Sequence, residues 1–357
     1  MSRETPDLRR FAPALIRWQR ESGRHGLPWQ GTRDPYRVWL SEIMLQQTQV
    51  AAVIGYYDRF LQRFPHVRAL AAATPDEVMA MWSGLGYYSR ARNLHRCAQQ
   101  VLVARGGEFP VRAAELEQLP GIGASTAAAI AAFCHGERIS IADGNVRRVL
   151  SRLLAFGGDL SASGPQREMW NLAQSLLPAS PAPDDMVAYT QGLMDLGSGV
   201  CTRTRPACGK CPVADLCAAQ QQGTTDRYPV KTRKVARRHE SWWLLVLRRR
   251  VADDRAEVWL ERRPGKGIWA GLFCVPVLVD EAAALAAAGV GHQAVQVLPS
   301  VSHALTHREL RLHPLLVDVV PDGSKQASQD GMWVSIDGLA ACGLPTPVRA
   351  LLERLTD

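Results

Sequence analysis

The spacing of the apolar residues changes once along this chain, and that change constrains the fold more than any other feature. From Pro6 to about Leu216 the apolar residues recur at helical intervals, as in Val50, Val53 and Tyr57. From Trp242 onwards they form short β-rich runs separated by Gly, Pro and Asp clusters. These runs are Trp242–Leu247, Val258–Leu260, Phe273–Val279, Leu312–Val320 and Met332–Val334, with helical patches near Glu281–Ala288 and Val348–Leu355. The sequence therefore predicts an all-α domain followed by an α+β domain.

A basic segment separates the two patterns. Residues 223–240 lack apolar periodicity and are typical of an exposed linker. Their cationic residues are Arg227, Lys231, Arg233, Lys234, Arg237 and Arg238. A chain of 357 residues is long enough for about two domains, and 46% hydrophobic with 21% charged residues excludes wholesale disorder. The predicted boundaries are 1–222 for the helical domain, 223–240 for the linker and 241–357 for the second domain.

The charge balance favours an anionic partner. The chain has 42 Lys and Arg against 34 Asp and Glu, a net charge of +8, which is consistent with nucleic acid without establishing it. Its longest apolar run, Thr126–Cys134, is far shorter than the ~20 residues that span a bilayer. Residues 1–7 have no signal-peptide core. We therefore expect a cytoplasmic protein with no membrane partner.

Four of the eight cysteines crowd into one short segment, at Cys201, Cys208, Cys211 and Cys217. In a chain without a signal peptide, such a clump indicates a metal site rather than disulfides. Four thiolates could bind one tetrahedral zinc ion or one cubane iron–sulfur cluster. Structural zinc usually has two CxxC-like pairs, and only one is present here. The spacing alone leaves zinc and [4Fe–4S] equally open.

The segment Leu119–Ala127 is a glycine-bounded hairpin that enters a helix. Gly121 and Gly123 would let the backbone turn sharply and approach a ligand, and the N–H groups at the start of the helix could bind a phosphate. The alternative is a plain helix–helix turn. The leading Leu-Pro and the small residues that follow favour a helix-hairpin-helix motif, which contacts DNA without reading its sequence.

Two acidic residues could carry chemistry. Glu42 stands among apolar neighbours in Val38–Leu45, so it lies either on the exposed stripe of a helix or in a dry pocket with a raised pKa. Asp143 immediately precedes a predicted helix, where the simpler role is that of N-cap. Periodicity cannot bring the two together; only a fold can.

Two further segments have the composition of base-contacting elements. Gln46–Gln49 places four amides and hydroxyls in a row, which could fill the hole left by an extruded base. Gly84–Arg90 places Leu85 and two tyrosines on a glycine-rich turn, where they could wedge between bases. Aromatic pairs are as often part of a core, so this alternative stays open.

These motifs occur in an order that resembles the bacterial adenine DNA glycosylases (MutY), a branch of the helix-hairpin-helix base-excision glycosylase family. The resemblance covers nearly the whole chain and is most specific in residues 27–217. It rests on Trp39–Val50, Gly84–Tyr88, Leu119–Gly123, Asp143–Val146 and the four cysteines. It implies an all-α helix-hairpin-helix domain with a [4Fe–4S] loop at 201–217, acting as a monomer on double-stranded DNA.

The resemblance also implies a reaction and roles for single residues. The family removes adenine mispaired with 8-oxoguanine or guanine. Glu42 resembles the general acid that protonates adenine, and Asp143 the carboxylate that stabilises the cationic sugar; Asn145 is assigned to the catalytic set with them. Ser125 occupies the position at which related endonuclease III-type enzymes carry a Schiff-base lysine, which predicts a monofunctional glycosylase that leaves an abasic site.

The same resemblance assigns the DNA contacts. Gln47, Thr48, Leu85 and Tyr87 would surround 8-oxoguanine on the opposite strand, and Gly121 and Gly123 would approach the backbone. Residues 264–272 resemble the glycine and tryptophan pattern of a Nudix-like domain, but the acid-rich helix of Nudix hydrolases is missing. This domain is therefore expected to recognise 8-oxoguanine rather than hydrolyse nucleotides. Thr306 and His307 match the damage-reading motif, with Leu305 where phenylalanine is usual.

Three alternative functions are weighed against this prediction. An endonuclease III-like glycosylase-lyase acting on oxidised pyrimidines is disfavoured by Ser125 and by the extra domain. A Nudix hydrolase fused to a DNA-binding module is disfavoured by the missing acidic helix. A non-catalytic iron–sulfur protein is disfavoured because Glu42 and Asp143 are both retained in their full motifs. The family would place the protein in the bacterial cytoplasm, at the nucleoid.

Overall fold

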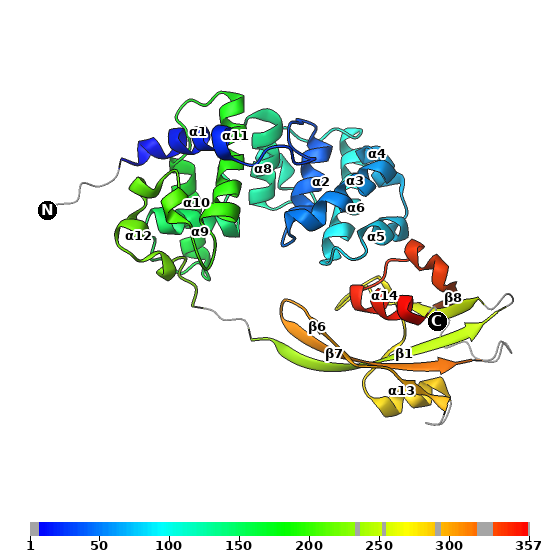
Figure 1. The fold of residues 1–357 in the computed structure, drawn as a ribbon. Coiled ribbons are helices and arrows are strands. Elements are labelled where there is room, and N and C mark those ends of the chain that lie inside the picture. The colour runs from blue at the N-terminus through cyan, green and yellow to red at the C-terminus, as the bar shows by residue number, and fades with distance from the viewer. Residues whose placement is uncertain (1–6, 233–235, 252–254, 290–293, 320–330, 356–357) are drawn as a thin grey trace. The chain divides into compact units, whose positions relative to one another are not determined.

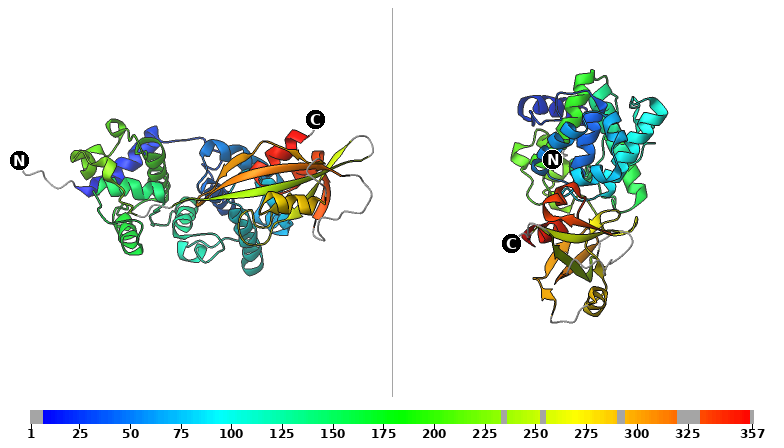
Figure 2. Two further views of the ribbon diagram at one scale, coloured as in Figure 1. Left: turned by 90° about the horizontal axis from the view of Figure 1, so that it is seen from below. Right: turned by 90° about the vertical axis from the view of Figure 1, so that its right-hand side faces the viewer.

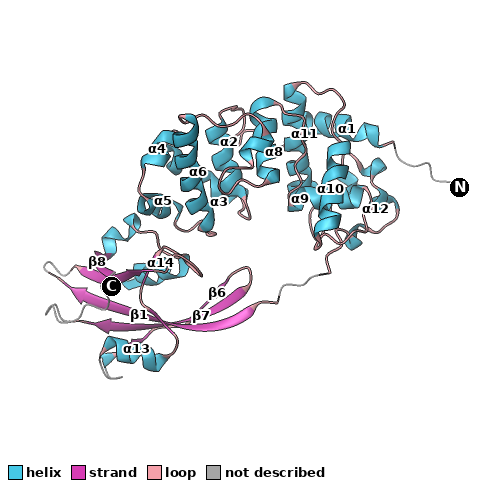
Figure 3. Ribbon diagram, turned by 180° about the vertical axis from the view of Figure 1, so that it is seen from behind, coloured by secondary structure: helices cyan, strands magenta, loops and turns pink. Residues whose placement is uncertain are grey.

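The computed structural model describes residues 7–232, 236–251, 255–289, 294–319 and 331–355. The chain forms two compact units, one made of Met1–Ala71 and Arg96–Lys234, the other of Ala72–His95 and Val235–Asp357. Figure 3 shows that the strands are confined to the second unit, whereas the first is helical. The predicted fold class is confirmed. Segment 72–95, however, belongs to the same unit as the C-terminal domain, which the sequence did not predict.

The first unit is built from short amphipathic helices (Figure 1). Its α-helices are α1 (Phe11–Ser22), α2 (Pro35–Leu45), α3 (Val50–Arg63), α4 (Val67–Ala72), α7 (Ala113–Leu116), α8 (Ala124–His135), α9 (Gly144–Leu153), α10 (Ser163–Ser175), α11 (Pro183–Asp195) and α12 (Ala218–Gln221), with a π-helical turn, η2, at Leu196–Val200. Helix α5 (Pro75–Trp82) belongs to the second unit, and α6 (Ser89–Arg105) begins in the second unit and ends in the first.

Local sequence signals fix where these helices begin. The Asp34 carboxylate accepts a hydrogen bond from the Tyr36 amide at 2.9 Å, with Pro35 at the first helical position of α2. Thr74 and Glu77 form a capping box at the start of α5. Because these signals depend only on neighbours in sequence, both helix starts can be recognised from the sequence.

The alanine-rich helix α8 lies at the centre of the first unit. Residues Ala127–Ala132 are all buried, and their small side chains allow α2, α7 and α11 to pack closely against them. On the outer side, the rings of Phe11 in α1 and Tyr189 in α11 meet edge to face, with centroids 6.2 Å apart. Helix α8 therefore fixes α2 and α11, two of the elements that carry candidate site residues.

The second unit contains one mixed eight-stranded sheet. Its strands are β1 (Arg238–Arg250), β2 (Ala256–Arg262), β3 (Phe273–Cys274), β4 (Val277–Leu278), β5 (Gln296–Val297), β6 (Val301–Ala304), β7 (Arg308–Asp318) and β8 (Gly331–Ser335). The main order is β3-β2-β1-β7-β5, with β1 and β7 parallel along their length. Helix α13 (Glu281–Ala288) covers one face of the sheet and α14 (Thr346–Leu352) the other (Figures 1 and 2).

The strands differ in detail from the predicted runs. Strand β1 begins at Arg238, inside the segment predicted as linker, because its first residues pair with the start of β7. Strands β5 and β6 were not predicted, since their side chains are largely exposed and lack a buried face. Arg233, Lys234 and Val320 lie outside the described residues. None of the described helices is long and apolar enough to cross a membrane.

Candidate functional site

A cavity of about 690 Å³ opens in the first unit between α2, α11 and the loop that joins α1 to α2. Helix α2 contributes Ser41, Glu42 and Leu45 to its wall. The remaining lining residues include Leu27, Trp29 and Gln30 of the loop, and Gln191 and Met194 of α11. This size and mixture of apolar and polar groups are typical of a pocket for a flat organic ligand such as a nucleobase.

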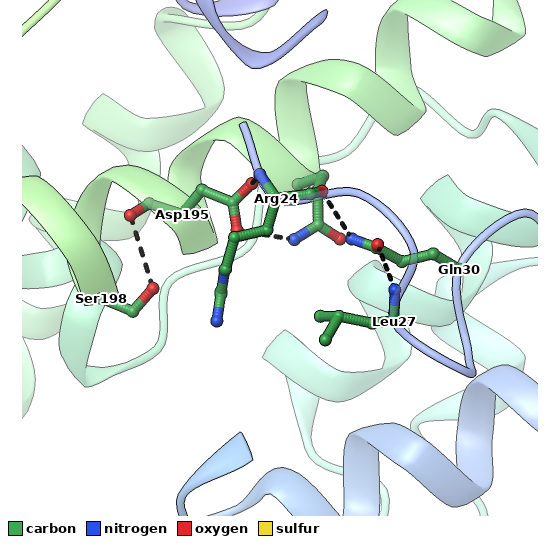
Figure 4. A network of polar contacts seen from close by, with 6 residues as sticks. Arg24, Leu27, Gln30, Asp195 and Ser198 are labelled. Atoms are coloured by element: carbon green, nitrogen blue, oxygen red, sulfur yellow. Dashed lines mark hydrogen bonds and ion pairs between the residues drawn. The ribbon is translucent and has the colours of Figure 1, made fainter. Parts of the chain in front are cut away.

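A polar network fixes the shape of the pocket loop (Figure 4). The buried Asp195 carboxylate accepts hydrogen bonds from the Arg24 amide at 2.9 Å, from Arg24 Nε at 2.7 Å and from Gln191 Nε2 at 2.9 Å. The Gln30 side chain closes the loop on itself, because it donates to the Arg24 carbonyl and accepts from the Leu27 amide, both at 3.0 Å. These hydrogen bonds hold the loop in place as one wall of the pocket.

Glu42 lies in this wall as an acid that stays protonated near neutral pH. Burial and, to a smaller extent, the negative charge of Asp143 together raise its pKa from 4.5 to about 8. The Glu42 side chain is half-buried, since it faces the cavity while protein surrounds it on the other sides. Of the two alternatives that the sequence left open, the raised pKa and the place of Glu42 in the cavity wall favour the pocket. The electrostatic coupling also shows that the fold brings Glu42 and Asp143 close together.

Asp143 caps helix α9 with one of its two carboxylate oxygens. Its Oδ1 accepts from the amides of Asn145 at 2.9 Å and Val146 at 2.8 Å. The residue is exposed, and the structure gives no hydrogen bond within the described residues for Oδ2. The cap thus orients the carboxylate, and its second oxygen can face a ligand.

Asn145 lies in the first turn of α9, where Gly197 packs closely against it. Its Oδ1 accepts from Arg148 Nη2 at 2.9 Å, and a Cβ on Gly197 would lie only 2.9 Å from the Asn145 Cβ. Arg148 also donates to the carbonyls of Gly197 at 2.6 Å and Cys201 at 2.9 Å. Asn145 is therefore held against the turn that leads into the cysteine segment.

Two hydrogen bonds connect α8 to the two segments that carry Glu42 and Asp143. Ser125 Oγ accepts from the amide of Ala142, the residue before Asp143, at 3.1 Å. Gln46 Nε2, at the end of α2, donates to Thr126 Oγ1 at 3.2 Å. The hydroxyl of Ser125 consequently lies beside the segment that presents Asp143.

The hairpin before α8 has the backbone that a phosphate contact requires. Gly121 has a φ of +78°, a left-handed conformation that favours glycine. Gly123 is the N-cap of α8, and both glycines are exposed. A Cβ at Gly123 would meet no atom within 4 Å, so the approach to the α8 amides is open.

Two of the predicted base contacts have strained backbones. Gln47 and Tyr87 are non-glycine residues at φ values of +58° and +48°. Such conformations cost of order 1–3 kcal/mol and tend to occur at functional sites. Gln47 is exposed after α2, and Thr48 beside it bonds back to the Gln46 carbonyl at 3.3 Å. Leu85, by contrast, is buried in this structure.

The second unit has its own cavity of about 460 Å³. Tyr87 lines it from the turn between α5 and α6, and Thr306 lines it from the turn between β6 and β7. The Tyr87 hydroxyl and Thr306 Oγ1 lie 3.5 Å apart. His307, next to Thr306, is exposed. The fold therefore unites two predicted damage contacts that are over 200 residues apart in sequence.

The four clustered cysteines line one small cavity of about 30 Å³. Burial, with a smaller contribution from the charge of the three other cysteines, raises the pKa of the Cys211 thiol to about 12. Arg152 is buried beside them and donates to Cys201 Sγ at 3.3 Å. Among the described residues no set of His, Cys, Asp or Glu is placed to hold a single metal ion. Four cysteine thiols on one cavity with a cationic side chain beside them have the chemistry that an iron–sulfur cluster requires of its ligands.

The sequence reasoning missed Asp195, Arg148 and Arg152, which hold the site together without facing a ligand. The sequence does contain a signal for Asp195, because its neighbours along the chain are apolar. A carboxylate in such surroundings is buried and needs a hydrogen-bond partner. The arginines of α9 gave no such signal, since charged residues at these positions are as often exposed.

Comparison with known proteins places these features in a family. Residues 40–175 match the model for HhH-GPD superfamily base excision DNA repair proteins. Residues 201–217 match the iron–sulfur binding domain of endonuclease III, and residues 249–354 match the NUDIX domain. The match at 201–217 decides between the two metals that the cysteine spacing left open. The cofactor is an iron–sulfur cluster, as predicted.

Similar proteins and structures agree with these matches. The adenine DNA glycosylase of Buchnera aphidicola (strain APS) is 32% identical over 348 residues, covering 96% of this chain and 97% of its own length. The human adenine DNA glycosylase is 43% identical over 230 residues, covering 62% of this chain and 41% of its own. A solved thermostable thymine-DNA glycosylase is 26% identical with a TM-score of 0.53, covering 60% of this chain and 97% of its own.

This chain thus combines an acid of raised pKa in the wall of a nucleobase-sized pocket with a helix-hairpin-helix and an iron–sulfur domain. It also aligns with a relative over nearly the whole length of both chains. This chain belongs to the family of adenine DNA glycosylases.

Proposed function

We propose that this enzyme is a monofunctional glycosylase that excises adenine mispaired with 8-oxoguanine or guanine and leaves an abasic site. The observation that carries the proposal is Glu42, an acid whose pKa is about 8 in the wall of a pocket of nucleobase size. Such a carboxyl is mostly protonated at pH 7. It can therefore donate a proton to a base that would otherwise leave as a poor anionic leaving group.

Asp143 is the second half of this chemistry. Loss of the base leaves positive charge on the sugar, and a nearby carboxylate stabilises that charge in the transition state. The cap on α9 orients Asp143 before the substrate arrives, so little reorganisation is needed. Asn145 belongs to the same constellation, held by Arg148. After departure of adenine, the ionised Glu42 can accept a proton from the attacking water.

The absence of an amine at position 125 supports monofunctional chemistry. A lyase forms an imine between a lysine amine and the sugar, and a serine hydroxyl cannot do so. In this structure Ser125 instead bonds the segment that presents Asp143. Borohydride trapping on adenine-containing duplexes is therefore expected to give no covalent adduct, which separates this function from that of a glycosylase-lyase.

We assign the reading of the opposite base to two groups of residues. Gln47 and Thr48 follow the α2 helix that carries Glu42, whereas Leu85, Tyr87, Thr306 and His307 belong to the second unit. The 3.5 Å approach of Tyr87 and Thr306 supports a shared contact with 8-oxoguanine. The open amides behind Gly121 and Gly123 would bind a phosphate of the DNA backbone.

Cys201, Cys208, Cys211 and Cys217 would hold the [4Fe–4S] cluster. When bound, the cluster supplies a rigid cross-link between four points of the segment that follows η2. Arg152 and Arg148 contact the Cys201 sulfur and carbonyl, so the same segment is also tied to α9. We place the enzyme in the bacterial cytoplasm, at the nucleoid, as a monomer, with a glycosylase domain over residues 1–222 and a linker that ends where β1 begins at Arg238.

One assay tests the proposal most directly. Single-turnover release of the base is measured on duplexes with adenine opposite 8-oxoguanine, guanine, thymine or cytosine. We expect fast release opposite 8-oxoguanine, slower release opposite guanine and little opposite the two pyrimidines. Equal rates on all four duplexes would contradict the proposed mispair specificity, whereas release of an oxidised pyrimidine would favour the endonuclease III-like alternative.

A further inference from the structure

The turn Gly84–Tyr88 has left-handed backbone at two glycines and at one residue, Tyr87, whose side chain disfavours it. Gly84 and Gly86 have φ values of +95° and +75°, and Tyr87 follows at +48°. A left-handed tyrosine is disfavoured by contact between its Cβ and the backbone. Tyr87 is also 43% exposed, so burial does not hold it in place. Something outside the turn must stabilise this conformation.

Contacts within segment 82–90 account for part of the stabilisation. Trp82 Nε1 donates to the Gly86 carbonyl at 3.1 Å, and Arg90 Nη2 donates to the same carbonyl at 3.2 Å. The Arg90 guanidinium lies 5.4 Å from the centroid of the Tyr87 ring. The Tyr88 hydroxyl also accepts from the Gly84 amide, at 3.4 Å, which closes the turn on itself.

Ser83, just before the turn, and Tyr88, its last residue, are both hydrogen-bonded to one carbonyl of the C-terminal domain. Ser83 Oγ donates to the Leu344 carbonyl at 2.8 Å, and the Tyr88 hydroxyl donates to it at 3.1 Å. Arg349 Nη2 donates to Ser83 Oγ at 3.2 Å and to the Cys342 carbonyl at 2.8 Å. Leu344 is fully buried, so its carbonyl depends on these donors.

The packing around Leu344 leaves little room for this arrangement to shift. A Cβ at Gly343 would lie 2.8 Å from the Met79 Cβ, which shows how closely α5 approaches the loop before α14. The Tyr88 ring is buried as well. Two donors from the turn therefore meet one acceptor whose own position is fixed by packing.

We propose that Ser83 and Tyr88 are positioning residues for damage recognition, through which the C-terminal domain holds the Gly84–Tyr88 turn in its strained conformation. This inference rests on the proposed function, in which Tyr87 reads 8-oxoguanine. The C-terminal domain then acts twice: Thr306 faces the damaged base directly, and the Leu344 carbonyl fixes the Tyr87 side of the same cavity. Thr306 and Tyr87 keep their spacing because both are anchored to one body.

The test compares full-length variants that keep side-chain shape but remove the two donors. In Ser83→Ala with Tyr88→Phe, both hydrogen bonds to the Leu344 carbonyl are lost while the Tyr88 ring and the packing remain. The same variant removes the bond from Arg349 to Ser83 Oγ and the bond from the Gly84 amide to the Tyr88 hydroxyl, so exchange is compared at the amides of residues 85–88 only. Loss of two hydrogen bonds of ordinary strength is expected to speed hydrogen–deuterium exchange of the turn amides by about 10- to 30-fold. The preference for 8-oxoguanine over guanine opposite adenine falls, whereas the rate of adenine release opposite guanine is unchanged.

Asp76→Asn is the matched control. It removes the exposed ion pair between Asp76 on α5 and Arg262 on β2, a 2.7 Å contact in the same unit that does not touch the turn. We expect neither exchange of the turn amides nor mispair preference to change. The single variants Ser83→Ala and Tyr88→Phe should each show part of the double variant's effect. A graded effect of this kind distinguishes loss of the two hydrogen bonds from a general loss of folding.

The outcomes distinguish anchoring of the turn from the role of the turn in damage recognition. Unchanged exchange in the double variant overturns the proposed anchoring, and faster exchange with intact preference overturns its role in recognition. A separate variant, Tyr87→Ala, tests whether Tyr87 reads the damage at all. If Tyr87→Ala keeps full preference, the assigned reading role fails, while the exchange measurement still decides whether the C-terminal domain holds the turn.

Discussion

Replacing Glu42 with glutamine should abolish adenine release and at the same time stabilise the fold at neutral and alkaline pH. The reason is the raised pKa of about 8 against an ordinary value of 4.5. Between these two values the unfolded chain loses its proton while the folded protein keeps it. Native stability contributed by the protonated form is therefore full below about pH 4.5 and is lost as the pH rises towards 8. Glutamine has no proton to lose and escapes this cost.

The size of the effect follows from the linkage. One pKa unit corresponds to about 1.4 kcal/mol, so the stability advantage of Glu42→Gln over the wild type should grow by about 3 kcal/mol between pH 5 and pH 8. Urea unfolding at several pH values measures this difference. Glu21→Gln, an exposed position on α1, is the control and should show no such growth.

The same pKa predicts the pH dependence of catalysis. Single-turnover adenine release by the wild type should be nearly constant below pH 8 and fall about tenfold for each further pH unit. Duplex affinity of Glu42→Gln should match that of the wild type, because the amide keeps the shape of the side chain. A wild-type rate that stays constant to pH 10, together with a pH-independent stability difference, would refute the assignment of Glu42 as a buried acid.

Four other outcomes are expected. Purified protein should be brown and contain iron, and Cys201→Ser should lose iron and DNA affinity before it alters the chemistry; one zinc and no iron per chain, by elemental analysis, would contradict this. Ser125→Lys should give some borohydride-trapped adduct, and a complete lack of adduct at every pH would show that position 125 does not face the sugar. Asp195→Asn should slow adenine release about tenfold by loosening the pocket loop, with the pH profile kept, since Glu42 is untouched; a shifted profile would instead indicate a direct role. Thr306→Ala with His307→Ala should lower the preference for 8-oxoguanine over guanine, and an unchanged preference would remove the C-terminal domain from damage reading.

Features that depend on near neighbours in sequence could be predicted without a structure. The starts of α2 and α5 follow from Asp34-Pro35 and from the Thr74 capping box, which act within one helical turn. The change from helical to β-rich spacing gave the fold class, because amphipathic periods directly reflect which face is buried. The cysteine spacing indicated a metal, and only family resemblance decided which one.

Features that depend on solvent exclusion and distant contacts required the tertiary structure. The sequence left Glu42 either exposed or buried, since its pKa depends on desolvation by α11 and the pocket loop and on the charge of Asp143 about a hundred residues away. The anchoring of Gly84–Tyr88 on the Leu344 carbonyl gave no sequence signal either. A backbone carbonyl has no side-chain identity to read, so only the packing of two remote segments could reveal that it positions a candidate damage-reading residue.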